Sequence, residues 1–525
     1  MRSLALLIIV LAAYLRLHNL VPVQRGLLWL QDYDEAVWDS TAQLLLQGYM
    51  PYRDFFATLP PAGIYLLAGV LRLVYVPWGS GVGLMATRYA SVVYGLVSVV
   101  LAYLTGRKLA GQAAGLVAAG LLAVDGMVIS MDRMAMLEPP LNLFSLAAVM
   151  VYLYVFDQTQ DSTQGKRLAM LAGVLAALAA LVKTQGMVMI LALLTVSLLR
   201  RRLWEALNIV LGFGLAWLGL SAYFLLQCSE GFLRQVYFFQ FLRPADGVVN
   251  RLSRLYDIWH YEQTWLTVRL GIVGGLLIGL QAIRHREARP WWIVLTWAGY
   301  TMALIIANSS YYPQYYVQLA VPLCLLGGGL LDARMWLGKL WHAVPGWIPK
   351  LTLGNVALIA ILGLGIVSGQ LPRQPRGIAK MLGQMDATYI NLADYIRQHS
   401  AQDARVLVFE PNYTFLASRP PAGAQPGRFI VDSYGEMLYL NLGIQDKSLL
   451  SLTKAVLTGK KYKLQPMFWD KPAQVHTLAA FERAEYVVID GRARYQLEPQ
   501  TLAAMQARST EVFASGVASL RKRDY

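Results

Sequence analysis

Apolar residues occur along the chain in long runs that are separated by short polar loops. A transmembrane helix needs roughly 20 predominantly apolar residues. The pattern predicts spans at residues 3–20, 84–105, 109–128, 139–156, 168–182, 186–200, 205–226, 265–283, 291–307, 314–332 and 351–369. The fold class that we expect is therefore a polytopic α-helical membrane protein with about 11 transmembrane helices.

Basic residues in the loops indicate which side of the membrane each loop faces, because Lys and Arg are enriched in cytoplasmic loops. Here they fall on alternate loops, on the same side as Arg2. These loops contain Arg107–Lys108, Lys166–Arg167, residues 200–202, residues 284–289 and residues 334–339. The pattern predicts a cytoplasmic N-terminus, with the first run retained as a span, and an extracytoplasmic C-terminal part.

The outside segment 30–83 predicts two helices that lie in the membrane interface. Apolar positions within residues 34–48 recur at helical spacing, and Gly48 supplies a stop. Residues 60–76 form a second apolar run that is too short to cross the bilayer, and two prolines suit its start as a helix. We expect both to be interfacial, juxtamembrane helices.

The pattern changes after residue 370. Long apolar runs give way to short β-like stretches at residues 406–409, 428–431 and 486–490, with helical stretches between them. This alternation predicts an extracytoplasmic α/β domain of ordinary size over residues 371–525. Residues 1–370 would then form the transmembrane domain.

The composition agrees with this topology and narrows the functions that fit the chain. Apolar residues make up 56% and charged residues 15%, with a mean hydropathy of +0.44, whereas soluble domains carry about 25% charged residues. The net charge is +15, but it lies mostly in short loops, so we expect membrane lipids and no nucleic acid as partners. Two cysteines are too few for a disulfide framework. Motifs for nucleotide-driven transport and the common hydrolases are absent from the sequence.

Four acids lie close together after the first span, at Asp32, Asp34, Glu35 and Asp39. Asp32 is interpreted equally well as a helix cap or as a functional acid, and Asp39 is interpreted as part of a solvated helix face. One cap needs only one acid, so Asp34 and Glu35 remain as candidate catalytic residues, because carboxylates held at a lipid interface are usually functional. A base at this position could deprotonate an acceptor hydroxyl.

Three further charged residues are predicted on the outer side, at Arg133, Glu138 and Lys183. Arg133 and Glu138 either form an internal salt bridge that closes their loop, or bind substrate as an anion clamp and an orienting carboxylate. Lys183 either snorkels to the interface or supplies a cation for a phosphate. All three are candidates for substrate binding.

Basic and aromatic residues are interleaved in the outside loop 228–264, and tyrosines cluster at residues 308–322. Most of the loop suits lipid headgroups, while an arginine such as Arg243 is a candidate for facing a phosphate. Tyr315 either belongs to the interfacial tyrosine belt or lines a groove for a sugar or a lipid phosphate. Arg53, in the first outside segment, is a further candidate for substrate binding.

Together these features resemble the GT-C glycosyltransferases, in the branch that contains protein O-mannosyltransferases and lipid A aminoarabinose transferases. The acid pair after the first span is followed by matches to the family pattern at Gly48, Tyr52, Asp54 and Pro60–Pro61. Later matches are Arg133, Glu138–Pro139 and Lys183–Thr184. The resemblance covers about residues 1–370, and the C-terminal part has only a general similarity to the outer domains of such enzymes.

The resemblance implies an inverting glycosyltransferase of a bacterial or archaeal cell membrane. Such an enzyme moves a sugar from a polyprenyl monophosphate to an acceptor hydroxyl on the outer side. Asp34 would be the base, and Glu35 and Glu138 would orient the base or the sugar hydroxyls. Lys183, Arg133 and a loop arginine would stabilise the departing phosphate.

The scheme requires no cofactor, because a monophosphate leaving group needs less stabilisation than a diphosphate. A divalent metal stays an open alternative, with Asp32 and Asp34 as its candidate ligands. The acceptor is a protein, a lipid or a glycan. Two other functions fit the composition: a transporter or flippase of lipid-linked sugars, which predicts charges in mid-span, and a non-catalytic subunit in cell-envelope assembly, which does not need the acid pair.

Overall fold

A computed structural model describes most of the chain. It leaves out residues 1, 19, 21–27, 30–31, 79, 160–161, 248–249, 262, 285, 332–384, 461–466 and 525. The predicted span 351–369 and the predicted domain boundary near residue 370 lie outside the described residues. The chain divides into two compact units. Unit 1 contains Met1–Leu20, Tyr89–Leu220 and Asn250–Leu382, and unit 2 contains Val21–Arg88, Ser221–Val249 and Gly383–Tyr525.

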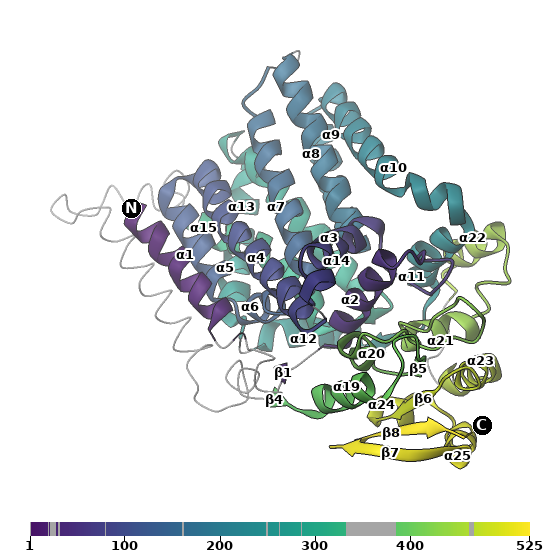
Figure 1. Ribbon diagram of the computed structural model, residues 1–525. Coiled ribbons are helices and arrows are strands. Elements are labelled where there is room, and N and C mark those ends of the chain that lie inside the picture. Colours follow the sequence, from purple (N-terminus) through teal and green to yellow (C-terminus); the bar gives the residue numbers. More distant parts are fainter. Residues whose placement is uncertain are drawn as a thin grey trace. The chain divides into compact units, whose positions relative to one another are not determined.

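Unit 1 is built from helices (Figure 1). They are α1 (Arg2–Leu17), α5 (Gln112–Val124), α6 (Gly126–Asp132), α7 (Glu138–Val155), α8 (Thr163–Val182), α9 (Met187–Leu199), α12 (Arg251–His260), α13 (Trp265–Arg284), α14 (Trp292–Ala307) and α15 (Tyr316–Gly329). Two long helices, α4 (Ser80–Ala110) and α10 (Leu203–Leu233), have residues in both units. Among the described residues, six helices are long and apolar enough to cross a membrane, or seven if the bent pair α5–α6 is one span. The total of eleven spans stays a prediction.

Close packing between α8 and α10 depends on two glycines. A Cβ atom added to Gly173 would lie 2.1 Å from the carbonyl oxygen of Ile209, and one added to Gly212 would lie 2.0 Å from that of Met170. Membrane helices approach this closely where small residues line their interface. A larger side chain at either glycine would therefore push the two helices apart.

The bend between α5 and α6 occurs at Asp125, where the two helix axes differ by 64°. The backbone of Asp125 is non-helical (φ −67°, ψ 115°), and its carboxylate caps α6 by accepting a hydrogen bond from the N–H of Val128 at 3.1 Å. The carboxylate also accepts a bond from the Tyr316 hydroxyl at 3.0 Å. These contacts fix the path of the chain towards the loop before α7.

Unit 2 contains a four-stranded sheet in the order β5–β6–β8–β7 (Figure 1). The strands are β5 (Val406–Leu407), β6 (Tyr486–Ile489), β7 (Ser509–Ser515) and β8 (Ala518–Arg523). β5 and β6 are parallel, and the other pairs are antiparallel. The strands predicted at residues 406–409 and 486–490 are confirmed, whereas the β7–β8 hairpin was not predicted. The strand predicted at 428–431 is wrong, because Phe429 forms an isolated bridge and donates its N–H to the carbonyl of Asp54 instead of joining the sheet.

The helices of unit 2 come from both ends of the sequence. They are α2 (Tyr33–Leu46), α3 (Pro61–Trp78), α11 (Phe239–Leu242), α19 (Thr388–His399), α20 (Asn412–Ala417), α21 (Ser433–Asn441), α22 (Leu449–Leu457), α23 (Lys471–Phe481), α24 (Gly491–Gln496) and α25 (Pro499–Ala507). In addition, β1 (Leu28–Trp29) pairs with β4 (Met385–Asp386). The two helices predicted in the first outside segment are present as α2 and α3, and Gly48 follows α2 with a φ of +91°.

The hydrophobic core of unit 2 joins segments that are far apart in sequence. Phe56 and Phe239 pack edge to face, with ring centroids 5.3 Å apart. Both belong to the same buried cluster as Leu438 and Phe481 from the C-terminal part. The segment that contains Phe56 therefore folds together with the C-terminal sheet.

Candidate active site

The first turn of α2 carries the predicted catalytic acids. Asp32 caps this helix, because its Oδ1 atom accepts a hydrogen bond from the N–H of Asp34 at 2.9 Å, and the interpretation of Asp32 as a cap is confirmed. Asp34 is half-buried and Glu35 is fully buried. The unpaired N–H groups at a helix start stabilise ionised carboxylates. Of the two candidates, Asp34 is the one that retains solvent access.

Glu35 forms a buried, bidentate ion pair with Arg88 of α4. Its two oxygen atoms accept hydrogen bonds from Nε and Nη2 of Arg88, both at 2.7 Å, and neither side chain is exposed. Parallel bonds of this kind fix the orientation of both partners. Arg88 was not selected from the sequence, although a charged residue inside the apolar run 84–105 was an available signal.

Asp39 lies in the same buried cluster, and its assignment to a solvated face is wrong. Its side chain is fully buried, and its Oδ2 atom accepts a hydrogen bond from the Thr87 hydroxyl at 3.0 Å. Burial, and then the charge of Glu35, raise the pKa of Asp39. Within the part of the chain that the structure describes, Oδ1 of Asp39 and Nη1 of Arg88 lack a hydrogen-bond partner. The cluster thus retains hydrogen-bonding capacity next to Glu35.

Asp32 and Asp34 were also the candidate ligands for a metal. Across the described ranges, no group of three or more His, Cys, Asp or Glu side chains is arranged to hold a metal ion. One oxygen of Asp32 is engaged in the helix cap. A metal site at Asp32 and Asp34 stays a prediction.

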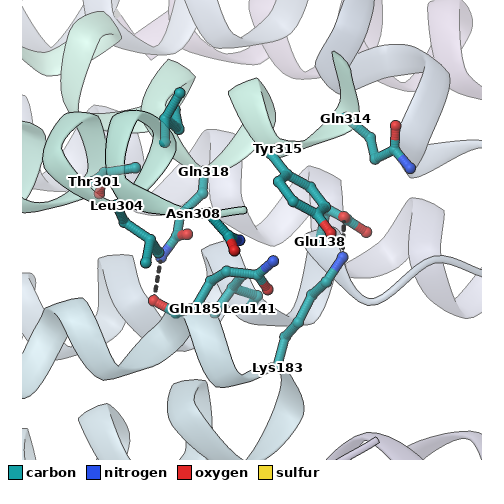
Figure 2. A pocket seen from close by; sticks show the side chains of 11 residues that line it. Glu138, Leu141, Lys183, Gln185, Thr301, Leu304, Asn308, Gln314, Tyr315 and Gln318 are labelled. Carbon is teal, nitrogen blue, oxygen red and sulfur yellow. Dashed lines mark hydrogen bonds and ion pairs between the residues drawn. The ribbon is translucent and has the colours of Figure 1, made fainter. Parts of the chain in front are cut away.

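Within unit 1, Glu138, Lys183 and Tyr315 lie together around a pocket (Figure 2). Lys183 forms an ion pair with Glu138, and its Nζ atom lies 5.3 Å from the centroid of the Tyr315 ring. The side chain of Lys183 is 12% exposed and that of Glu138 is 3% exposed. The rest of the lining is mixed, with polar side chains at Gln185, Thr301, Asn308, Gln314 and Gln318 and apolar ones at Leu141, Leu304 and Ile305.

Two local features of the sequence build this pocket. Glu138 begins α7, where Pro139 and Pro140 favour a helix start. Lys183 ends α8 in an extended conformation, before the short 3₁₀ turn Thr184–Gly186. Gly186 allows this break, because a Cβ atom there would lie 2.3 Å from the Ala179 carbonyl. The alternative of an internal salt bridge between Arg133 and Glu138 is not the pairing observed, since the carboxylate of Glu138 pairs with Lys183.

Arg133 has a different set of contacts. Its Nη1 atom donates to the carbonyls of Leu15, Arg16 and His18, at 3.1, 3.0 and 2.7 Å, and so binds the C-terminal end of α1. It does not line the pocket of Glu138 and Lys183. These contacts give Arg133 a structural role, and its function as an anion clamp stays a prediction.

The remaining arginine candidates pair with neighbouring acids in unit 2. Arg53, 51% exposed, forms two hydrogen bonds with Asp54, at 2.8 and 2.9 Å. Arg243 lies 3.4 Å from Asp246. In unit 1, the loop arginine that points inward is Arg254, which donates to the carbonyls of residues 305, 308 and 309 at the end of α14. That a loop arginine such as Arg243 faces a phosphate stays a prediction.

Comparisons with known proteins show which families and structures this chain is similar to. The family model described as dolichyl-phosphate-mannose-protein mannosyltransferase matches residues 7–228. A relative from Pseudomonas fluorescens, undecaprenyl phosphate-alpha-4-amino-4-deoxy-L-arabinose arabinosyl transferase 2, is 25% identical over 486 residues, which are 86% of this chain and 77% of the relative.

Two solved structures share the fold over almost the whole chain. ArnT from Cupriavidus metallidurans, determined with bound undecaprenyl phosphate, matches with a TM-score of 0.59 and 15% identity, over 99% of this chain and 96% of ArnT. The archaeal oligosaccharyltransferase AglB from Archaeoglobus fulgidus matches with a TM-score of 0.58 and 10% identity, over 97% of this chain and 72% of AglB. The predicted resemblance to GT-C glycosyltransferases is confirmed, and the chain is an integral membrane protein.

Proposed function

We propose that this chain, a membrane glycosyltransferase of the GT-C type, transfers a sugar with inversion from a polyprenyl monophosphate to an acceptor hydroxyl on the outer side of the membrane. The acceptor oxygen attacks the anomeric carbon, the bond from that carbon to the phosphate oxygen breaks, and the polyprenyl phosphate leaves with the electron pair. The sugar is a hexose or a pentose, and the acceptor is a protein, a lipid or a glycan. The Pseudomonas relative, named as an undecaprenyl-phosphate-sugar transferase, supports the donor class and favours transfer over transport or a purely structural role.

The observation that carries this proposal is the contrast between the two acids in the first turn of α2. Glu35 is buried and held by Arg88, whereas the adjacent Asp34 retains solvent access. Asp34 would accept the proton of the acceptor hydroxyl, and Glu35 would fix the orientation of the turn that carries it. A positioned general base typically accelerates a reaction about 10²–10⁴-fold.

The pocket of unit 1 offers the chemistry that a departing phosphate needs. Lys183 is a cation at the wall of a mixed polar and apolar pocket, and Tyr315 and several amide side chains add hydrogen-bonding groups. We assign Lys183 to the phosphate and Glu138 to the orientation of Lys183 or of sugar hydroxyls. Fixed cations of this kind supply charge stabilisation without a bound metal.

The proposal is tested with purified protein in detergent and undecaprenyl phosphate that carries a radiolabelled hexose or pentose. Release of the label from the lipid, by transfer or by slow hydrolysis, is compared between the wild-type chain and Asp34→Asn. We expect the variant to be slower by about 10²–10⁴-fold, with binding of undecaprenyl phosphate retained. Equal rates for the two proteins would refute the assignment of Asp34.

A further inference from the structure

Tyr33, the residue between Asp32 and Asp34, makes contacts with a distant part of the sequence. The hydroxyl of Tyr33 donates to Oδ1 of Asp432 at 2.9 Å and lies 3.4 Å from the Ser433 hydroxyl. It also accepts a hydrogen bond from the N–H of Tyr434 at 3.2 Å. All of these partners lie at the start of α21, about 400 residues further along the chain and within the same compact unit.

The ring of Tyr33 is held as well. The guanidinium carbon of Arg492 lies 3.9 Å from the centroid of this ring, which is the geometry of a cation–π contact. Arg492 is itself oriented by Glu410, whose Oε2 atom accepts a hydrogen bond from Nε at 2.9 Å. The other oxygen of Glu410 accepts a bond from Asn412 at 3.1 Å. The hydroxyl and the ring of Tyr33 are thus fixed by separate side chains.

The topology of the sheet explains why these side chains meet. Glu410 follows β5 by three residues, and Asp490 follows β6 directly and caps α24, in which Arg492 lies. Because β5 and β6 are parallel, their carboxyl ends lie at the same edge of the sheet. In open α/β sheets this edge is where ligands bind. Here Arg492 from that edge contacts the ring of Tyr33, and α2 packs against α20, the helix that follows β5.

We infer that Tyr33 is a positioning residue, held by Asp432, Ser433 and Arg492 in an arrangement that we call the Tyr33 clamp. The clamp orients the first turn of α2, and with it Asp34 and Glu35. Residues from the C-terminal part of the chain would thereby help to position the catalytic base. The inference rests on the proposed function, because it takes Asp34 to be the base. An error of about 1 Å in the position of a reacting group can cost a factor of about 10² in rate.

The test uses the full chain in the radiolabel assay, with Tyr33→Phe, Tyr33→Ala and, as a matched control, Tyr495→Phe. Tyr33→Phe loses the hydroxyl contacts but keeps the ring under Arg492, and Tyr33→Ala loses both. Tyr495 lies in α24 of the same domain and is 50% exposed, so its loss of a hydroxyl removes none of the clamp. We expect kcat to fall about 10-fold for Tyr33→Phe and about 100-fold for Tyr33→Ala. The KM for the lipid donor should change less than about 3-fold, because the donor contacts are intact.

A second pair of variants separates positioning from folding. Arg492→Lys keeps a cation over the ring and should retain most of the activity, whereas Arg492→Gln should behave like Tyr33→Phe. Unchanged kcat in both Tyr33 variants would overturn the inference. It would also be overturned if the Tyr33 variants had the same activity per folded molecule as the wild type, with the folded fraction determined by thermal unfolding in detergent. If Asp34→Asn is inactive while Tyr33→Ala is fully active, the clamp alone is wrong, and if Asp34→Asn is active, the proposed function fails.

Discussion

Two ion pairs, one in each compact unit, each join a glutamate to a basic side chain but differ in their exposure to solvent. Glu35 and Arg88 are completely buried and joined by two short hydrogen bonds. Glu138 and Lys183 line a pocket, and the lysine is partly exposed. A buried pair has lost its hydration, so each charge depends on the other. A pair at a pocket wall can exchange one partner for a ligand. We therefore assign positioning to the first pair and binding to the second.

The largest effect is expected when one partner of the buried pair is removed. Arg88→Met removes the cation that balances the buried Glu35 carboxylate, and we expect the free energy of unfolding in detergent to fall by about 3–5 kcal/mol. The double variant Arg88→Met with Glu35→Gln should recover much of this loss, because neither charge of the pair remains. Arg53→Met serves as the control, since Arg53 is half exposed and pairs with its sequence neighbour, and it should change stability little. Equal melting temperatures for Arg88→Met and Arg53→Met would contradict the expected difference between a buried and an exposed ion pair.

Removing the charges of Glu138 and Lys183 should lower the affinity for undecaprenyl phosphate more than it lowers the stability of the fold. The double variant Lys183→Met with Glu138→Gln removes both charges, so neither is left without its partner. We expect the affinity for undecaprenyl phosphate to fall about 10–100-fold, the range for losing a charge-assisted hydrogen bond. Its thermal stability should change far less than that of Arg88→Met. Unaltered binding of undecaprenyl phosphate, measured directly with the purified chain, would exclude this pocket as the phosphate site.

A smaller, pH-dependent effect is expected from Glu410, which orients Arg492. Burial raises the pKa of Glu410 from 4.5 to about 7, against the lowering effect of Arg492, while the charges of Asp490 and Asp32 add to the increase. Between pH 4.5 and 7 the folded chain thus binds more protons at Glu410 than the unfolded chain does. Its contribution to stability is present at low pH and is lost as the pH rises through 7. Thermal unfolding of wild type should show this slope, and Glu410→Gln should flatten it. An unchanged slope in the variant would mean that Glu410 does not titrate in this range.

The smallest effect is expected from chelation. If Lys183 stabilises the departing phosphate, EDTA should leave the rate of sugar release within about 2-fold of its starting value, because a fixed cation already supplies the charge. Recovery of a lost rate by Mg²⁺ or Mn²⁺ would instead support a metal at Asp32 and Asp34. The same samples can be used for the stability measurements, so loss of folded protein is separated from loss of metal.

Local patterns in the sequence predicted one part of this site and missed another. The cap at Asp32, the stop at Gly48 and the helix start after Glu138 each depend on a few neighbouring residues, and all are present. Glu138 and Lys183 were separate candidates for substrate binding, and the structure brings both to one pocket, where they pair with each other. Their role in substrate binding stays a prediction.

The contacts that position the acids could not be predicted from neighbouring residues in the sequence. The ion pair of Glu35 with Arg88 spans 53 residues, and the contact of Tyr33 with Asp432 spans 399. No periodicity or motif connects segments at that separation. Asp39 was misassigned for the same reason, because its burial depends on how α2 packs and not on the sequence around it. Pairing across long distances is therefore where the structure adds most to the account of this site.

The central claim is that Asp34 is the catalytic base and Asp32 only a cap, and one comparison tests it directly. Asp34→Asn and Asp32→Asn each remove one carboxylate, from positions two residues apart, and Asn caps a helix as well as Asp does. With undecaprenyl phosphate carrying a radiolabelled sugar, we predict that Asp34→Asn loses about 10²–10⁴-fold in rate, while Asp32→Asn stays close to wild type. Comparable losses in both variants, or an active Asp34→Asn, would contradict the account.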